Sequence, residues 1–306
     1  MRIQFLSIVI PVYNSAQMLE QLYEEISSAV SGVVPFEVIF VNDRSRDESF
    51  AVIQKIRDAN PDHVTGISLL KNSGQHNAIS CGLGFAKGDA IITMDDDLQH
   101  PPSEIPKLIA EYERSRCDVV YGDYPNKKHP GWRKTGSWLL RRGSKTMGEG
   151  PGRGSSFRIL SKSIAEKIIQ HNRTGFIFID EIIGWYSGNV SYINVEHHPR
   201  RSGKSTYSGG KLISFYFDII INYSAFPLKA MTWVGLISSC LTFMLGLRFI
   251  YKKLVHGSAP GFTAIIVTVL FSTSVLMLCL GIIGQYMYKL YQTRNRRPPF
   301  TVDKVV

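Results

Sequence analysis

Cysteine is scarce in this chain of 306 residues, and its four cysteines are widely dispersed. Cys81, Cys117, Cys240 and Cys279 show neither the paired spacing of zinc ligands nor the density of a disulfide framework. This excludes a small disulfide-stapled domain and a zinc-binding module. A cleavable signal peptide is also lacking before the apolar run that starts at Ser7, so we expect the amino-terminal part to stay in the cytosol.

Charged residues are absent from Phe262 to Tyr288, and Arg248 is the only one between Met231 and Ile250. Each stretch is long enough for a helix that crosses a bilayer, which needs roughly 20 apolar residues. The segment 251–261 between them is too short to be a domain, so the pair predicts a transmembrane hairpin. The alternative is two helices buried in a soluble domain, although soluble helices seldom run so far without charge.

Basic residues flank this hairpin and predict its orientation. By the positive-inside tendency, both outer ends face the cytoplasm. The flanking residues are Arg200, Arg201, Lys204, Lys211 and Lys229 before the hairpin, and Lys289, Arg294, Arg296 and Arg297 after it. Arg248, Lys252 and Lys253 lie at the far end and count against this orientation, unless their side chains snorkel to the opposite headgroups.

The net charge of +10 fits a catalytic domain with a membrane anchor. Next to a bilayer, basic side chains serve anionic lipid headgroups and phosphorylated substrates, so we expect the lipid bilayer as a partner and no nucleic acid. The expected parts are a cytosolic domain with amphipathic interface helices at 1–225, the two-helix hairpin at 226–290 and a basic cytosolic tail at 291–306. Such a protein belongs in the inner cell membrane as a multi-pass protein.

Strand and helix signals alternate through the first hundred residues. Apolar, β-branched runs predict strands at 6–12, 37–41, 64–70 and 89–94, with helices between them. Asn14 or Ser15 is expected to cap the first helix. This order predicts an α/β fold with a mainly parallel sheet, and ligands of such folds bind at the carboxyl ends of the strands.

Three consecutive carboxylates, Asp95, Asp96 and Asp97, follow the fourth predicted strand. Because side chains alternate along a strand, Asp95 and Asp97 can face the same side and share a divalent cation. Oxygen ligands favour a hard ion such as Mg²⁺ or Mn²⁺. The alternative is a solvated acidic turn that ends the strand.

Five motifs together resemble the family 2 GT-A glycosyltransferases, and the paired apolar stretches make the polyprenyl-phosphate glycosyltransferases the more similar group. That group includes dolichyl-phosphate mannose synthase and the GtrB-type and ArnC-type transferases. The motifs are Ser7-Ile-Val-Ile-Pro-Val-Tyr-Asn14, Val41-Asn-Asp-Arg-Ser-Arg-Asp47, Lys71-Asn-Ser-Gly-Gln-His76, Asp95-Asp-Asp-Leu-Gln-His-Pro-Pro102 and Asp118-Val-Val-Tyr-Gly122.

The resemblance implies transfer of a sugar from a UDP- or GDP-linked donor to a polyprenyl phosphate, with Mg²⁺ or Mn²⁺ on the departing diphosphate. The implied metal ligands are Asp95, Asp97 and Gln99. The implied nucleotide-binding residues are Pro11, Tyr13, Asn14, Asp43, Lys71, Asp95 and Asp96. For Asp43, a turn residue at a strand end is the alternative.

The lipid phosphate is expected near basic residues later in the chain. The resemblance implies that Arg133, Ser137, Arg200 and Ser205 lie near it. Arg200 can grip phosphate oxygens in a bidentate manner, on either the lipid or the donor. With Asp97 and Asp180, it completes the residues that we expect to act in catalysis.

Two stretches depart from the family pattern. Many relatives have Asp-x-Gly-Asp-Phe-Arg where this chain has Arg153-Gly-Ser-Ser-Phe-Arg158, so both carboxylates are missing. Asp180, next to Glu181, is a candidate replacement that contacts sugar hydroxyls. The alternative is that these acids stabilise the dipole of a helix at its start. The family's Ser-Lys-Tyr is Ser205-Thr206-Tyr207 here, which leaves no lysine at position 206.

Two other functions stay open at this point. One is a membrane-anchored family 2 enzyme that adds a sugar to a saccharide or lipid hydroxyl. The other is an inactive GT-A domain that serves as a membrane scaffold, which the intact Asp95, Asp97 and Gln99 disfavour. The sugar, the nucleotide and the polyprenol are left open, as is the oligomeric state, with a homo-oligomer among the expectations.

Overall fold

The computed structural model describes residues 2–123, 155–171, 178–196, 262–294 and 298–306, together with seven single residues between 233 and 255. The chain divides into two compact units. The larger comprises Met1–Thr206 and Arg296–Val306, and the smaller comprises Tyr207–Asn295.

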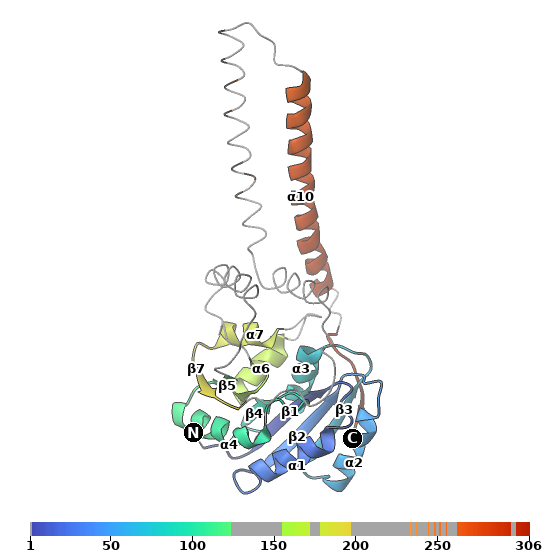
Figure 1. Cartoon of the computed structure of the whole chain (residues 1–306), viewed down its shortest axis with the longest axis vertical. Coiled ribbons are helices and arrows are strands. Elements are labelled where there is room, and N and C mark those ends of the chain that lie inside the picture. The colour runs from blue at the N-terminus through green and yellow to red at the C-terminus, as the bar shows by residue number, and fades with distance from the viewer. Residues whose placement is uncertain are drawn as a thin grey trace. The chain divides into compact units, whose positions relative to one another are not determined.

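Eight strands of the larger unit form one sheet in the order β7-β5-β6-β4-β1-β2-β3-β8 (Figure 1). Their bounds are Leu6–Val12 (β1), Phe36–Asn42 (β2), Val64–Leu69 (β3), Ala90–Thr93 (β4), Val119–Asp123 (β5), Arg158–Ser161 (β6), Val190–Asn194 (β7) and Val302–Val305 (β8). β1 pairs in parallel with β2 and β4, as β2 does with β3 and β5 with β7. Only β6 and β8 pair antiparallel with their neighbours among the described strands. The predicted mainly parallel α/β sheet is confirmed.

Helices cover both faces of this sheet (Figure 1). Helices α1 (Leu19–Val30), α2 (Ser49–Ala59) and α4 (Ile105–Ser115) pack on one face, and the short 3₁₀ helix η1 (Pro102–Glu104) precedes α4. Helices α3 (Gln75–Phe85), α6 (Lys162–His171) and α7 (Ile179–Tyr186) pack on the other. Because both faces are covered, the central strands are apolar at nearly every position.

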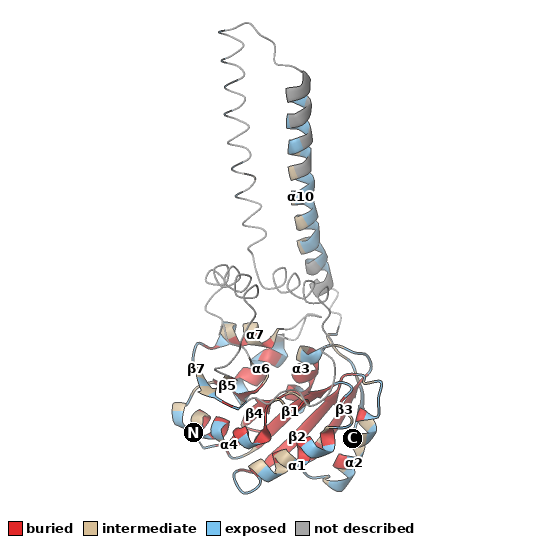
Figure 2. Ribbon diagram, viewed as in Figure 1, coloured by how far each residue is buried: buried red, intermediate tan, exposed pale blue. Residues whose placement is uncertain are grey.

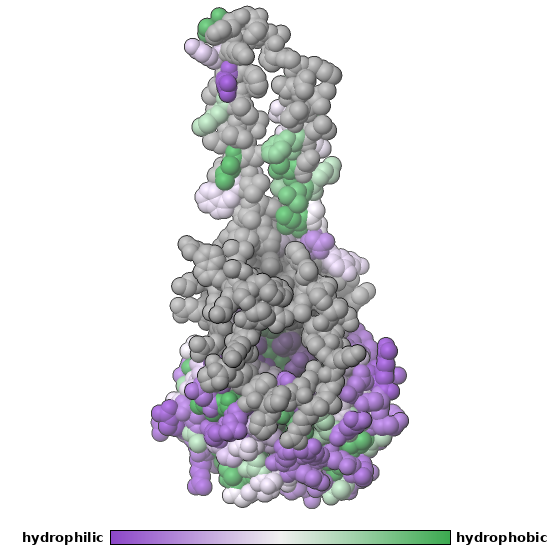
Figure 3. All heavy atoms as spheres, viewed as in Figure 1, coloured by the Kyte–Doolittle hydropathy of each residue, from purple (hydrophilic) through white to green (hydrophobic). Residues whose placement is uncertain are grey.

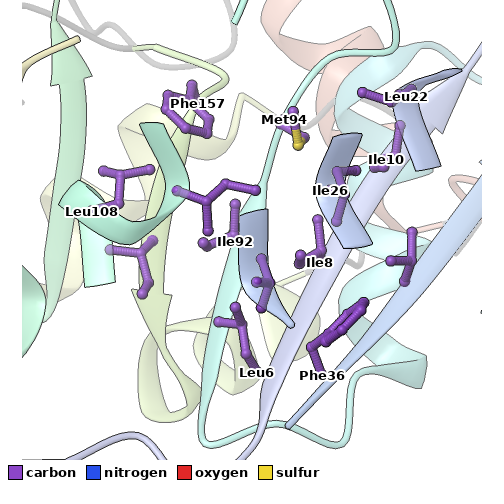
Figure 4. Packing of buried hydrophobic residues seen from close by; sticks show 14 of the residues in the cluster. Leu6, Ile8, Ile10, Leu22, Ile26, Phe36, Ile92, Met94, Leu108 and Phe157 are labelled. Atoms are coloured by element: carbon purple, nitrogen blue, oxygen red, sulfur yellow. The ribbon is translucent and has the colours of Figure 1, made fainter. Parts of the chain in front are cut away.

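The core on the α1 side shows how the strands divide their side chains between the faces. Ile8 and Ile10 of β1 lie beside Leu22 and Ile26 of α1 (Figure 4). Val9 belongs to the core on the opposite face, as the period of two in a strand requires. All five side chains are fully buried, and burial of each contributes about 1.5–3 kcal/mol to folding.

The predicted cap of the first helix is wrong. Helix α1 begins at Leu19 with Met18 at its N-cap position, and no side chain caps it. Asn14 instead adopts a left-handed conformation with φ of 56°. Its side-chain oxygen accepts the N–H of Arg46 at 2.8 Å, which ties the loop after β1 to the loop after β2. Asn14 therefore connects the loops that follow two neighbouring strands and does not cap the helix.

The smaller unit contains the long helix α10 (Phe262–Arg294), whose 33 residues span about 50 Å at 1.5 Å per residue. Its described side chains are mostly exposed and many are hydrophobic (Figures 2 and 3). The window Phe271–Tyr288 has a mean hydropathy of 1.4 and is long enough to cross a membrane. It is the one such candidate among the described residues, and alone it is weak evidence. The other predicted span, from Met231 to Ile250, lies largely outside the described residues. The seven single residues described between 233 and 255 are helical.

The last residues of the chain return to the sheet of the larger unit. Strand β8 pairs with β3, and Gly66 and Val306 exchange two backbone hydrogen bonds of 2.8 and 3.0 Å. Gly66 leaves room for this contact, because a Cβ atom there would lie 2.8 Å from the Val306 side chain. The stretch that we expected to be a basic tail thus contributes an edge strand.

Candidate active site

Polar residues gather where four neighbouring parallel strands end. Asn14 follows β1, Asp43 follows β2, Lys71 follows β3 and Asp95 follows β4. The carboxyl ends of parallel strands meet at one edge of a sheet, and ligands of open α/β sheets bind there. The structure therefore brings the residues after the first four predicted strands to one edge.

Asp95 is held on both of its carboxylate oxygens. Gln75 donates its amide N–H to Oδ1 at 2.6 Å, and the Ser156 hydroxyl donates to Oδ2 at 2.5 Å. Burial raises the pKa of Asp95 to about 7, opposed by the Ser156 hydrogen bond and supported by the negative charges of Asp97 and Asp96. A cation at this carboxylate would offset both the cost of burying its negative charge and the repulsion from Asp96 and Asp97.

Asp96 and Asp97 make different contacts. The Oδ2 atom of Asp96 accepts the Tyr13 backbone N–H at 3.1 Å and the Ser15 hydroxyl at 2.5 Å, which anchors the loop after β1. Burial raises the pKa of Asp96 to about 6 against these hydrogen bonds. Asp97 is 7% exposed, and its Oδ1 accepts the Gln99 backbone N–H at 3.1 Å. Asp96 therefore has a structural role that the sequence did not reveal.

The chemistry of these groups fits a hard divalent cation. Asp97 is close enough for its charge to raise the pKa of Asp95, and both side chains offer oxygen ligands. Within the described part of the chain, no group of three or more His, Cys, Asp or Glu side chains could hold a metal ion. A cation here would complete its coordination with the Gln99 amide, with water or with oxygens of a substrate. Mg²⁺ typically binds in that way, through one or two carboxylates and substrate phosphates.

The expected nucleotide wall is partly exposed at this edge. Pro11 is buried in β1, whereas Tyr13 is 38% exposed and Asn14 is exposed. Lys71 is also exposed, in the turn between β3 and α3. Aromatic and polar side chains at this edge of the sheet are thus exposed to solvent near the acidic triplet.

Asp43 contacts the start of α3 with both carboxylate oxygens. Its Oδ1 accepts the Ser73 N–H at 2.6 Å, and its Oδ2 accepts the Gly74 N–H at 2.8 Å. Burial raises the pKa of Asp43, and these two hydrogen bonds oppose that increase. Asp43 therefore orders the turn that carries Lys71 and Gln75, as well as lying at the end of β2.

Asp180 forms a buried ion pair with Arg158. Its Oδ1 accepts a guanidinium N–H of Arg158 and, at 3.0 Å, the Tyr121 hydroxyl. Arg158 is 1% exposed and lies opposite Tyr121 of β5 and Thr93 of β4 in the sheet. The side chain of Asp180 is 14% exposed. The carboxylate predicted to contact sugar hydroxyls thus neutralises a buried arginine.

His76, at the start of α3, lies close to this ion pair. Burial lowers its pKa to about 4, with Arg158 adding to the decrease and Asp180 opposing it. The ring packs edge-on against Phe178 with centroids 5.1 Å apart. Its Nδ1 is buried without a hydrogen-bond partner among the described residues. His76 is therefore neutral at physiological pH.

Comparison with known proteins identifies the family. The model of "Glycosyl transferase family 2" matches residues 7–169, which is more than half of the chain. The chain belongs to glycosyl transferase family 2. It is therefore a glycosyltransferase, and the acidic triplet lies within the matched region.

Curated relatives match this glycosyltransferase over nearly its whole length. The undecaprenyl-phosphate 4-deoxy-4-formamido-L-arabinose transferase of Proteus mirabilis is 32% identical over 100% of this chain and 95% of its own. The protein of the same name from Yersinia enterocolitica is 33% identical over 100% and 94%. A crystal structure of glucosyl-3-phosphoglycerate synthase from Mycobacterium tuberculosis aligns with a TM-score of 0.53 and 19% identity, covering 71% of this chain and 76% of that one. This likeness shows the GT-A fold.

The glycosyltransferase site also contains residues that the sequence reasoning missed. Gln75 and Ser156 hold Asp95, and Arg158 pairs with Asp180. Gln75 and Arg158 lay within stretches already singled out, but sequence shows no contacts between distant segments. The predicted lipid-phosphate residues Arg133, Ser137, Arg200 and Ser205 lie outside the described residues.

Proposed function

We propose that this glycosyltransferase transfers a sugar from a nucleoside diphosphate sugar to a polyprenyl phosphate of the undecaprenyl type, for modification of cell-envelope glycans. One observation carries the proposal. The family model ends at residue 169, but relatives named for a reaction of undecaprenyl phosphate match the whole chain, including the apolar and basic stretches beyond that point. The match to those relatives thus includes the stretches that we propose to bind the acceptor, as well as those that we propose to bind the donor.

On the donor side, Asp95, Asp97 and Gln99 are the residues that would hold Mg²⁺ or Mn²⁺. Such an ion supplies positive charge for the diphosphate that leaves. Pro11, Tyr13, Asn14, Asp43, Lys71 and Asp96 line or order the same edge and bind the UDP or GDP portion. Solved structures of this fold include a complex with Mn²⁺ and UDP-glucose, at 18% identity to this chain.

On the acceptor side, the nucleophile is a phosphate that is already ionised at neutral pH. It needs no strong general base, unlike a sugar hydroxyl. Arg133, Ser137, Arg200 and Ser205 bind this phosphate in the proposal. Arg200→Ala is then expected to lower turnover on polyprenyl phosphate by about one to two decades, the worth of a charge-assisted hydrogen bond, and Arg200→Lys to restore only part.

Chain connectivity supports a membrane hairpin. Residues 295–301 join α10 to β8, and seven extended residues reach at most about 25 Å. If α10 crosses the bilayer, its carboxyl end lies on the same side as the sheet and Phe262 lies on the other. The segment 197–261 must then cross an odd number of times. The apolar stretch from Met231 to Ile250 is the candidate for this crossing. The positive-inside tendency supports a catalytic unit and outer ends on the cytoplasmic side.

A product assay tests the proposal. Purified protein in detergent is incubated with Mn²⁺, polyprenyl phosphate and a panel of UDP- and GDP-sugars that includes a 4-deoxy-4-formamido-L-arabinose donor. Mass spectrometry is expected to show polyprenyl phosphate carrying one sugar, and mild acid is expected to release that sugar. A lipid product that resists mild acid would instead indicate transfer to a hydroxyl. Absence of any product with every donor would favour an inactive scaffold.

A further inference from the structure

A series of hydrogen bonds connects the buried ion pair to Asp95. Arg158, paired with Asp180, donates from Nε to the Thr93 hydroxyl oxygen at 3.2 Å. The Thr93 hydroxyl donates to the backbone carbonyl of Ser156 at 2.7 Å. Ser156 then donates its own hydroxyl to Oδ2 of Asp95 at 2.5 Å. The donors run outwards from Arg158 of β6, to Asp180 of α7 on one side and, through Thr93 of β4 and the segment before β6, to Asp95 on the other.

The chemistry of the groups leaves one arrangement for these hydrogen bonds. A guanidinium has no acceptor, and a threonine hydroxyl has a single proton to donate. Thr93 must therefore accept from Arg158 and donate to the Ser156 carbonyl. Thr93 is fully buried and Arg158 is 1% exposed, so bulk water does not compete for either group. The backbone of Ser156 is consequently held in one place.

The opposite side of Asp95 is held by Gln75, which approaches from the start of α3. Both carboxylate oxygens of Asp95 thus accept hydrogen bonds from uncharged donors, Gln75 at the start of α3 and Ser156 before β6. A carboxylate held in one orientation loses little side-chain entropy when it binds a ligand, whereas a free side chain must be ordered at that moment. Fixed supporting groups of this kind typically tune the affinity of a metal ligand.

We propose that Thr93 and Ser156 are positioning residues that hold Asp95 in the orientation in which it binds the cation of the donor diphosphate, and that Asp180 acts through Arg158 and Thr93. The inference rests on the proposed function for the role of Asp95. It assigns Asp180 to the support of the donor site and not to the sugar hydroxyls. It also gives a function to Ser156, which stands in the stretch where the expected carboxylates are missing.

The pair Thr93→Val and Thr93→Ser tests this proposal. Valine keeps the shape of threonine and removes the hydroxyl, whereas serine keeps the hydroxyl. Mn²⁺ binding is measured in the presence of UDP, and of GDP in parallel, from the electron paramagnetic resonance signal of free Mn²⁺. Thr93→Val is expected to weaken Mn²⁺ binding about tenfold, the effect of one lost hydrogen bond, and Thr93→Ser to stay within about twofold of the wild type. Ser156→Ala is expected to match Thr93→Val.

Ser7→Ala is the matched control. Ser7 is a fully buried hydroxyl on the neighbouring strand β1, which donates to Glu37 at 2.7 Å and accepts the Gly88 N–H at 2.8 Å. Its loss is expected to lower the melting temperature and leave Mn²⁺ affinity unchanged. Wild-type Mn²⁺ affinity in Thr93→Val, or an equal loss in Ser7→Ala, would overturn the proposal. No acceptor lipid is present in this measurement, so failure of the proposed acceptor would show separately in the product assay.

Discussion

At the scale of single residues, neighbours in the acidic triplet have different tasks. Asp95 is held by side chains on both oxygens, whereas Asp96 anchors the loop after β1 through Tyr13 and Ser15. Asp97 is almost fully buried, and its carboxylate accepts the N–H of Gln99, two residues away. Asp96 thus contacts the loop after β1, whereas Asp95 contacts Gln75 and Ser156.

Asp97→Asn tests the proposed cation site. Asparagine retains an oxygen that can accept the Gln99 N–H, so the fold is expected to survive with little change in melting temperature. Loss of one charged ligand is expected to lower sugar transfer at least about a hundredfold, because the cation supplies several kcal/mol of transition-state stabilisation. Transfer and thermal unfolding are measured on the same preparation. Full activity of the variant, or of the wild type in EDTA, would contradict the assignment.

His76 makes the stability of the protein depend on pH. Its pKa is lowered to about 4 in the folded protein from 6.5, so the unfolded chain binds the proton more readily between these values. The contribution of neutral His76 to the free energy of unfolding is therefore fully present above pH 6.5 and is lost as the pH falls towards 4. Between pH 7 and pH 5 the loss from this one group is roughly 2 kcal/mol, since one pKa unit corresponds to about 1.4 kcal/mol.

The comparison of wild type with His76→Gln isolates this effect. Glutamine does not titrate. From pH 7 to pH 5, the unfolding free energy of the His76→Gln protein is therefore expected to decrease by about 2 kcal/mol less than that of the wild type. Denaturant unfolding at pH 7 and pH 5, both in EDTA, provides the measurement. Equal losses in the two proteins would show that His76 is not the group responsible.

At the scale of elements, the chain uses its last residues to close one edge of the sheet. An exposed edge strand presents unpaired N–H and C=O groups that invite association with other chains. Strand β8 covers β3 in this way, and Asp303 also approaches Arg44 to 4.0 Å in the loop after β2. The segment after α10 therefore supports the strands that carry the proposed donor site.

A protein that ends after Thr301 tests the role of β8. Removing residues 302–306 breaks the backbone pairing with β3, including the two bonds between Gly66 and Val306. At about 0.5–1.5 kcal/mol for each hydrogen bond, a destabilisation of a few kcal/mol is expected. Lys304→Ala changes an exposed side chain and serves as the control, with an unaltered melting temperature. Truncation without loss of stability would argue that β8 contributes nothing to the sheet.

At the scale of the whole molecule, the order of the chain constrains the proposed membrane topology. The catalytic sheet uses residues from both before and after α10. A single crossing is incompatible with that arrangement, because the two parts of one sheet must lie on the same side of the bilayer. The proposed membrane topology is thus tied to the folding of the catalytic unit.

Cysteine labelling tests this topology in membrane vesicles of known orientation. Lys304→Cys, on the exposed side of β8, is expected to react with an impermeant maleimide from the cytoplasmic side. Ser258→Cys, between the two apolar stretches, is expected to react from the opposite side only. The native cysteines require an unsubstituted control under the same conditions. Cytoplasmic labelling of both positions would mean that the hairpin enters the bilayer and returns without crossing it.

The sequence by itself determined the parallel α/β arrangement and the edge of the sheet at which we propose the donor site. Apolar runs bounded by turns specify strands, and their alternation with helices indicates parallel pairing, so Asn14, Asp43 and Asp95 could be placed at strand ends. Only the tertiary structure showed that β8 joins the sheet and that Ser156, Thr93 and Arg158 connect Asp180 with Asp95. Those contacts join segments up to hundreds of residues apart, and no local pattern encodes them, because packing of distant side chains decides which partners meet.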